Sequence, residues 1–235
     1  MTAYVIEAPP IYENAANYFL AELGFYRLGY VVERFKLSTL QTFEVDAETP
    51  VFGGMESLQI ALPDYVGLPY YPPELSDFMY RRTAVCDIDA VQPGEFFKPQ
   101  AHQHKLFLAR VKDDSFQCEL LLGKIPAGTQ VVVSEAVNFL AEHRVYVHNG
   151  EILNICLYKG DPLQLPDVEA ITTMVAATKH YAAAYGLDVG VLANGKTALV
   201  ELNDFCCLGN YGLRAVAYAK CIADRWTEVW NQFHA

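Results

Sequence analysis

The clearest alternation of apolar and polar residues lies in residues 187–203 (LDVGVLANGKTALVELN), on both sides of Asn194-Gly195. An Asn-Gly pair between two alternating runs is typical of a β-hairpin with a two-residue type I′ turn, because both central residues of that turn need positive φ angles. Such a turn would place Ala193 opposite Lys196. We therefore expect a hairpin near the C-terminus whose register is set by this turn.

Acidic side chains meet on one face of this predicted hairpin. Counting outward from the turn places Asp188 opposite Glu201, and Asn203 points to the same face two residues further along. The Cβ atoms of directly opposed residues are only about 5 Å apart, and like charges there are destabilising unless something compensates them. Two carboxylates and an amide oxygen suit Mg²⁺ or Mn²⁺, with phosphate oxygens or water completing the octahedron. The alternative is an ordinary solvated hairpin with a chance pair of acids.

The first 80 residues alternate between strand-like and helix-like patterns. The expected strands cover residues 3–7, 30–35 and 50–54, and the expected helices cover residues 14–29 and 56–65. This alternation is typical of a small α/β lobe with parallel strands. Residues 63–73 (PDYVGLPYYPP) are too rich in Pro and Tyr for one regular element. We interpret them as a connection between two lobes that ends near Arg81-Arg82, with tyrosines packed at the junction.

From residue 95 onward the pattern changes to antiparallel β. Strands are expected at residues 96–99, 106–111 and 131–133, with the polar tract 100–104 between the first two. A second Asn-Gly pair, at residues 149–150, predicts another hairpin.

This second hairpin has one charged face. Its register places His148 opposite Glu151 and Arg144 opposite Ile155, and it brings Glu142, Arg144 and Lys159 to the same side. The solvent side of an ordinary antiparallel ribbon would show the same pattern, so both interpretations stay open at this point.

Two helices are expected in the last part of the chain. Pro166-Asp167 would open the first helix, which would run to about Tyr185 and end at Gly186. Its expected core-facing residues are Val168, Ile171, Val175 and Tyr181. The second helix would follow residue 212, and its apolar spacing places Trp226 and Trp230 in the core rather than against a cofactor.

The composition indicates a globular chain. Its 235 residues, 52% of them hydrophobic, suffice for one large domain or two lobes with a real core. No run of about 18 apolar residues is present, and the first ten residues (MTAYVIEAPP) lack the features of a signal peptide. The six cysteines show no C-x-x-C spacing, so we expect small buried thiols in a reducing compartment and predict a cytoplasmic protein.

The net charge of −11 argues against broad binding to nucleic acid or to an anionic membrane, since both are held mainly by cationic surface. Any anionic ligand must therefore be met by a local cluster of Lys and Arg.

Several stretches in the second half of the chain resemble the pattern of the ATP-grasp superfamily, especially its compact members. They are residues 142–147 (EHRVYV), 158–161 (YKGD), 188–191 (DVGV), 200–204 (VELND) and 208–213 (LGNYGL). The resemblance begins near residue 96, whereas the first 80 residues match only in their general α/β character.

This resemblance implies an ATP-grasp fold of mixed α/β and α+β type. It implies an N-terminal α/β lobe at residues 1–80 and an ATP-grasp domain at residues 81–235. Within that domain, a small β-rich subdomain at about 95–137 and a metal-binding subdomain at about 138–235 would grip the nucleotide between them.

The resemblance also implies roles for individual residues. Lys98 and Lys105 would grip the nucleotide phosphates, and Glu135 or Glu142 would meet the ribose hydroxyls. The hinge that meets the adenine edge would consist of Ser134, Glu135, Ala136 and Val137.

On the opposite side of the nucleotide, Arg144 and Lys159 would face phosphate or the acyl phosphate as catalytic cations. Asp188, Glu201 and Asn203 would hold Mg²⁺ or Mn²⁺, which are the ligands that the hairpin register selects independently. One departure is the tract 100–104, which is short and lacks glycine, whereas many relatives carry a longer glycine-rich loop over the triphosphate.

The implied activity is ATP- and Mg²⁺-dependent ligation of a carboxylic acid to an amine through an acyl phosphate, with release of ADP and phosphate. Its partners would be ATP, a small-molecule or peptide carboxylate and an amine, while the oligomeric state, including a homodimer, stays open. Two alternatives are kept: a kinase for a small molecule, and a non-catalytic nucleotide-binding or interaction protein. The residues that select the acid and the amine would lie in the N-terminal lobe and in residues 204–212, where Asn210 and Tyr211 either line the pocket or only hold the loop.

Overall fold

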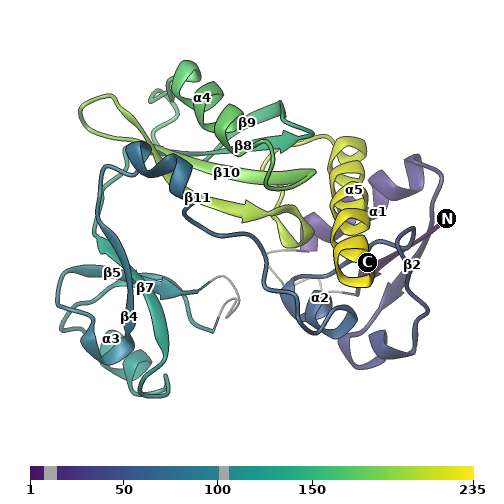
Figure 1. The fold of residues 1–235 in the computed structure, drawn as a ribbon, viewed down its shortest axis with the longest axis horizontal. Coiled ribbons are helices and arrows are strands. Elements are labelled where there is room, and N and C mark those ends of the chain that lie inside the picture. Colours follow the sequence, from purple (N-terminus) through teal and green to yellow (C-terminus); the bar gives the residue numbers. More distant parts are fainter. Residues whose placement is uncertain (8–14, 101–105) are drawn as a thin grey trace.

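The computed structural model describes residues 1–7, 15–100 and 106–235, and it contains three β-sheets within those ranges. Figure 1 shows a small β lobe at one end, a central sheet, and an N-terminal part beside the C-terminal helix at the other end. No helix in the described ranges is long and apolar enough to cross a membrane.

The N-terminal sheet has the strand order β2-β1-β3, and its strands are parallel. Its elements are β1 (Thr2–Ile6), α1 (Ala15–Arg27), β2 (Val31–Phe35), η1 (Leu37–Thr42), β3 (Val51–Phe52) and α2 (Met55–Ala61). Ala3 and Val5 of the central strand are fully buried. The α/β alternation expected from the sequence is thus confirmed.

The small sheet has the order β4-β7-β5-β6 and is antiparallel. Its elements are β4 (Thr83–Asp87), η3 (Ile88–Ala90), β5 (Glu95–Pro99), β6 (Arg110–Val111), α3 (Phe116–Leu122) and β7 (Gln130–Glu135). The strand expected over residues 106–111 is confirmed only at its end, since Leu106 and Leu108 are exposed outside it. β4 and α3 had not been predicted.

The central sheet is antiparallel with the order β11-β10-β8-β9. Its strands are β8 (Ala141–His148), β9 (Glu151–Gly160), β10 (Ala184–Val191) and β11 (Thr197–Asp204). Helix α4 (Val168–Thr178) packs on one face through Ile171, Met174 and Val175, against strand residues such as Val145 and Leu187. The opposite face is therefore left to the side chains that alternate with these residues.

The prediction of one helix from residue 167 to about 185 was wrong, because it merged a helix with a strand. Helix α4 ends at Thr178 and β10 begins at Ala184. Gly186 lies inside that strand, where a Cβ atom would come within 2.7 Å of the Leu208 side chain, so close packing rather than a helix end explains the glycine. Val168, expected in the core, is 61% exposed.

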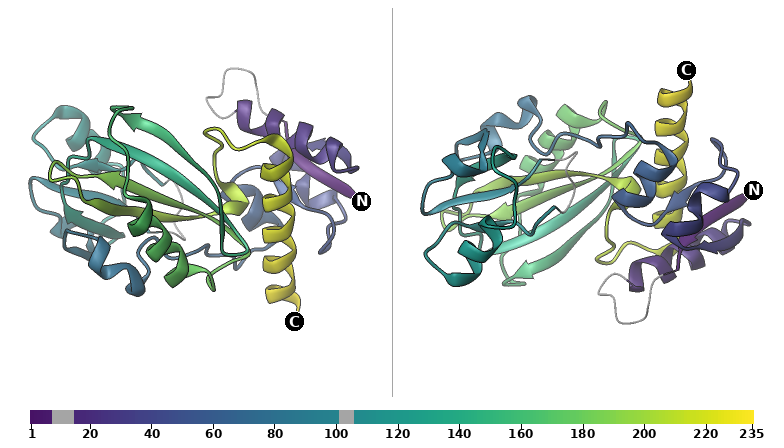
Figure 2. Two further views of the ribbon diagram at one scale, coloured as in Figure 1. Left: turned by 90° about the horizontal axis from the view of Figure 1, so that it is seen from above. Right: turned by 90° about the horizontal axis from the view of Figure 1, so that it is seen from below.

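The closing helix α5 (Ala215–His234) lies between the central sheet and α1 (Figures 1 and 2). Trp226 is fully buried, and its indole N–H donates to the Asp46 carbonyl at 2.8 Å, so its predicted place in the core is confirmed. Three of the expected buried thiols, Cys118, Cys206 and Cys221, are indeed buried.

The connection from the N-terminal lobe to the small sheet contains η2 (Pro73–Phe78) and no strand, as its Pro and Tyr content had indicated. It passes along the outer edge of the central sheet, where the N–H of Leu202 in β11 donates to the Tyr70 carbonyl at 2.8 Å. This connection therefore covers the exposed edge of β11.

Candidate active site

The three predicted metal ligands lie together on the face of the central sheet that α4 does not cover. The side-chain nitrogen of Asn203 is 3.2 Å from the Asp188 carboxylate and 3.1 Å from the Glu201 carboxylate. Asp188 is 2% exposed, so this cluster is removed from bulk water. The sequence-based prediction that the three side chains share one face is confirmed.

The predicted pairing of Asp188 with Glu201 is also observed, although the turn differs from the prediction. Of the turn residues, only Gly195 has a positive φ angle, and the turn contains three residues because Leu192 donates its N–H to the Lys196 carbonyl. The predicted pair of Ala193 with Lys196 is therefore wrong. The extra turn residue shifts the register by one, and a β-bulge between the turn and Asp188 shifts it back.

The second hairpin has the predicted type I′ turn, since Asn149 and Gly150 both have positive φ angles. His148 pairs with Glu151 as expected, but Arg144 pairs with Cys156 rather than Ile155, because the ladder contains a bulge.

Two cations neutralise the acidic cluster. Arg144 on β8 pairs directly with Asp188, and its guanidinium donates to both carboxylate oxygens at 2.6 Å. Lys98 on β5 reaches across from the small sheet, and its ammonium lies 2.5 Å from Glu201. The charged face of the second hairpin is therefore part of the site and not an ordinary solvated surface.

Burial and these contacts act against each other in the acid–base properties of the site. Burial alone would raise the pKa of Glu201, but the Lys98 ammonium outweighs it and holds that pKa below its ordinary value. For Arg144, burial would lower the pKa, yet the Asp188 carboxylate raises it above its usual range. Burial also raises the pKa of Asp188, and the neighbouring Glu201 raises it further against the effect of Arg144.

The donor set fits a hard divalent cation. The amide nitrogen of Asn203 occupies the point on which the two carboxylates converge, and turning the amide over would direct its oxygen there instead. Across residues 1–7, 15–100 and 106–235, no three His, Cys, Asp or Glu side chains gather as a metal site, so the third protein ligand must be this amide oxygen. Two carboxylates and an amide are typical ligands of Mg²⁺ and Mn²⁺.

A cavity of about 150 Å³ lies between the small sheet and the central sheet, and Glu201 lines it. The other predicted site residues that line it are Lys98, Ser134, Glu135, Val137, Glu142 and Lys159. Ala136 is exposed and lies outside its lining, and Lys105 lies outside the described residues.

Both candidates for the ribose contact line this cavity. Glu135 accepts hydrogen bonds from the Arg82 backbone N–H at 3.1 Å and from its guanidinium, and the backbone bond is the main cause that lowers the pKa of Glu135. Glu142 accepts from the Tyr158 hydroxyl at 2.9 Å and from the Lys159 ammonium. The geometry therefore keeps both carboxylates as candidates.

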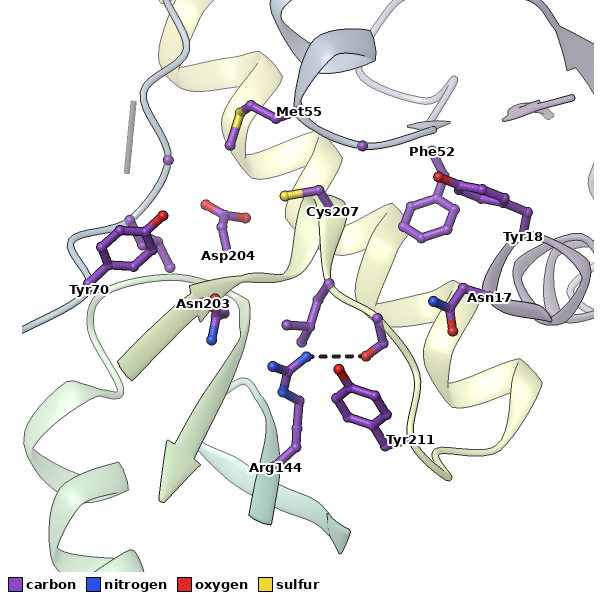
Figure 3. A pocket seen from close by; sticks show the side chains of 15 residues that line it. Asn17, Tyr18, Phe52, Met55, Tyr70, Arg144, Asn203, Asp204, Cys207 and Tyr211 are labelled. Carbon is purple, nitrogen blue, oxygen red and sulfur yellow. Dashed lines mark hydrogen bonds between the residues drawn. The ribbon is translucent and has the colours of Figure 1, made fainter. Parts of the chain in front are cut away.

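A second cavity, of about 220 Å³, lies on the other side of the acidic cluster between the central sheet and the N-terminal lobe. Asn203 and Arg144 line it from the sheet, and Figure 3 shows Asn17 and Tyr18 of α1 across from them. The loop after β11 contributes Tyr211, as one of the two sequence-based interpretations had it.

The other interpretation of that loop holds for Asn210. Its side-chain oxygen accepts the N–H groups of Gly212 and Leu213, each at 2.7 Å, so it holds the loop in shape.

Several residues of the site had not been singled out from the sequence. Tyr70 lies under Lys98, whose ammonium is 3.5 Å from the ring centroid, and desolvation raises the pKa of Tyr70 to about 12. Tyr71, Arg81 and Phe139 line the first cavity. The density of Tyr and Pro in residues 63–73 was the available signal, and it had been assigned only to packing.

The arrangement is that of an ATP-grasp protein: a β-rich lobe with a lysine, a central antiparallel sheet with paired acids, and a cavity between them. Residues 78–221 match a family of ATP-grasp domains, described as the second family of its clade. The chain belongs to this family, which confirms the resemblance seen in the sequence and supports the prediction of an ATP-dependent carboxylate–amine ligase. No curated protein sequence matches the chain.

Solved structures show the same fold at low sequence identity. D-cycloserine synthetase is 12% identical with a TM-score of 0.58, and the match covers 96% of this chain and 100% of that chain. The D-alanine–D-alanine ligase of Bacillus anthracis, solved with ATP, is 10% identical with a TM-score of 0.58, and 98% of each chain is covered. N5-carboxyaminoimidazole synthetase of Staphylococcus aureus is 8% identical with a TM-score of 0.53, covering 95% of this chain and 77% of that chain.

Proposed function

We propose that the protein joins a carboxylic acid to an amine in a reaction that depends on ATP and Mg²⁺, proceeds through an acyl phosphate, and releases ADP and phosphate. The observation that carries this proposal is the position of the acidic cluster between two cavities: Glu201 lines one and Asn203 lines the other. A γ-phosphate held in the first cavity would thereby meet a carboxylate held in the second.

Attack of a carboxylate on a γ-phosphate brings two anions together, so the site must supply positive charge at the point of attack. Lys98 and Lys159 line the first cavity and Arg144 lines the second. Asp188, Glu201 and Asn203 would hold the Mg²⁺ ion, which when bound neutralises phosphate charge. Arg144 would orient the attacking carboxylate, because its guanidinium lines the second cavity and is anchored by Asp188.

In this structure Lys98 contacts Glu201. We infer that nucleotide binding moves the Lys98 ammonium from this carboxylate to phosphate, while the carboxylate takes its place as a metal ligand. Tyr70 and Tyr71, whose ring centroids lie 3.5 and 4.8 Å from the ammonium, would guide Lys98 in both positions.

The substrates in this proposal are ATP, a small-molecule or peptide carboxylate, and an amine. Structures in the comparison include a ligase of D-alanine and a macrocyclase bound to a precursor peptide, so both substrate sizes occur on related folds.

The test is ADP release from Mg²⁺-ATP with panels of acids and amines, with Glu201→Gln as the metal-site variant. Acid labelled with ¹⁸O should transfer one label to the released phosphate, because an acyl phosphate passes a carboxylate oxygen to phosphorus. Unlabelled phosphate would contradict the acyl phosphate. A stable phosphorylated product formed without any amine would instead indicate a kinase, and stabilisation by ATP without ADP formation would indicate a binding protein.

A further inference from the structure

A β-bulge in β11 brings Glu201 to the face of Asp188. Val189 pairs with Leu199, and the next pair is Asp188 with Glu201, so Val200 has no partner on β10. Because side chains alternate along a strand, a regular ladder would turn Glu201 toward the opposite face, which is packed against α4. The position of this carboxylate therefore depends on the bulge.

Arg81 contacts the backbone of this bulge from the outer edge of the sheet. β11 is an edge strand, and the Arg81 guanidinium donates to the Leu199 carbonyl at 2.6 Å and to the Val200 carbonyl at 2.9 Å. In a regular strand, consecutive carbonyls point to opposite sides. One guanidinium reaches both carbonyls here because the bulge turns them to the same side.

The side chain of Arg81 suits this task. A guanidinium is a planar fork whose N–H groups can bond two acceptors at once, whereas a lysine ammonium acts as a compact point charge. Replacing arginine by lysine would keep the charge and remove the fork.

The backbone before Arg81 is held in an unfavourable conformation. Tyr80 has a φ angle of 47°, in the left-handed region that is uncommon for residues other than glycine. Such strain persists only where surrounding contacts determine the conformation. Here the guanidinium also lies 5.5 Å from the Tyr71 ring centroid and 5.9 Å from that of Phe139, so several contacts fix its position.

We propose that Arg81 is a positioning residue for the carboxylate of Glu201, acting through the β-bulge at Val200. The inference rests on the proposed metal site and adds a residue to it. Arg81 belongs to the connection between the lobes, so the connection shapes the metal site as well as joining the lobes.

The test measures Mn²⁺ binding by electron paramagnetic resonance in the presence of a non-hydrolysable ATP analogue. Arg81→Lys should weaken Mn²⁺ binding by about tenfold or more, in the range seen when residues that support metal ligands are changed. Arg34→Lys is the matched control, because Arg34 makes a forked contact with Glu22 at 2.6 and 2.9 Å in the N-terminal lobe. That control should bind Mn²⁺ like the wild type.

A double-mutant cycle separates positioning from a general structural effect. If Arg81 acts through Glu201, then Arg81→Lys should add little further loss of Mn²⁺ affinity once Glu201→Gln is present. Affinity for the ATP analogue without metal should stay unchanged. If the lysine variant does not fold, Arg81→Gln, which keeps one donor for the bulge, enters the same cycle.

The outcomes distinguish this inference from the proposed function. Absent Mn²⁺ binding by the wild type, or full binding by Glu201→Gln, would overturn the metal site itself. Full binding by Arg81→Lys, in a protein whose Glu201→Gln variant is impaired, would overturn only the role of Arg81. Additive losses in the cycle, or weaker metal-free binding of the ATP analogue to Arg81→Lys, would also overturn that role.

Discussion

Replacing Arg225 by methionine would remove the partner of a carboxylate that is buried beside the second cavity. Arg225 and Asp204 have side chains that are each 3% exposed, and the guanidinium donates to both carboxylate oxygens at 3.1 and 2.6 Å. Asp204 also accepts the Tyr65 hydroxyl and the Cys206 N–H. The pair therefore joins α5, β11 and the connection between the lobes.

The expected destabilisation follows from what the substitution leaves behind. Breaking a buried ion pair by removing one partner costs about 3–5 kcal/mol, because the other charge remains buried and unpaired. Two hydrogen bonds to charged groups, at about 1.5–3 kcal/mol each, lead to a similar figure. We expect Arg225→Met to lower the free energy of unfolding by about 3–5 kcal/mol near neutral pH.

Urea unfolding of wild type and variant measures this difference. Lys220→Met is the control on the same helix, because its ammonium forms an exposed i,i+4 pair with Asp224 at 2.8 Å. The control should lose no more than about 0.5 kcal/mol.

The dependence of this loss on pH supplies a second check. Burial would raise the pKa of Asp204, but Arg225 outweighs it and lowers that pKa, so the wild-type pair stabilises the fold above the ordinary aspartate pKa and loses this effect as pH falls. Without the guanidinium, burial would raise the pKa of Asp204, and the variant would be stabilised by protonation in acid. The difference between wild type and variant should therefore shrink from neutral pH toward about pH 4. A loss below about 1 kcal/mol, or one independent of pH, would refute this reasoning.

Further predictions concern the site and its packing. Lys98→Met should weaken binding of an ATP analogue by about tenfold in calorimetry, since a buried phosphate contact is lost, whereas Lys124→Met on the exposed side of the small lobe should not. Gly190→Ala should destabilise the fold by about 1–3 kcal/mol in thermal unfolding, because the new Cβ atom would overlap the Phe139 ring and must displace it. Asn203→Asp should lower the thermal midpoint without metal, by adding a third like charge to the cluster, and enlarge the rise in midpoint caused by Mn²⁺; an unchanged response to Mn²⁺ would speak against a metal there.

The metal hairpin shows how far local pattern carries. The alternating residues around Asn194-Gly195 predicted the pairing of Asp188 with Glu201, and the structure contains that pair. Two deviations from the predicted ladder, a longer turn and a bulge, cancel each other. Neither has a local sequence signal, since a bulge depends on contacts from outside the strand.

The same limit explains the misplaced helix end. Residues 167–185 fit a helical pattern, but residues 184–191 pair with neighbouring strands on both sides, and this pairing overrides local preference. The sequence could not show these partners.

The sequence by itself determined the α/β start, the antiparallel remainder, and the residue types at the acidic cluster, because strand periodicity and motif spacing are local properties of the chain. Only the tertiary structure decided that Arg144 and Lys98 neutralise the cluster, that two cavities meet at it, and that the connection with Tyr70 and Arg81 supports it. These contacts join residues that are far apart in sequence. They are set by how the three sheets pack, and no local pattern encodes that packing.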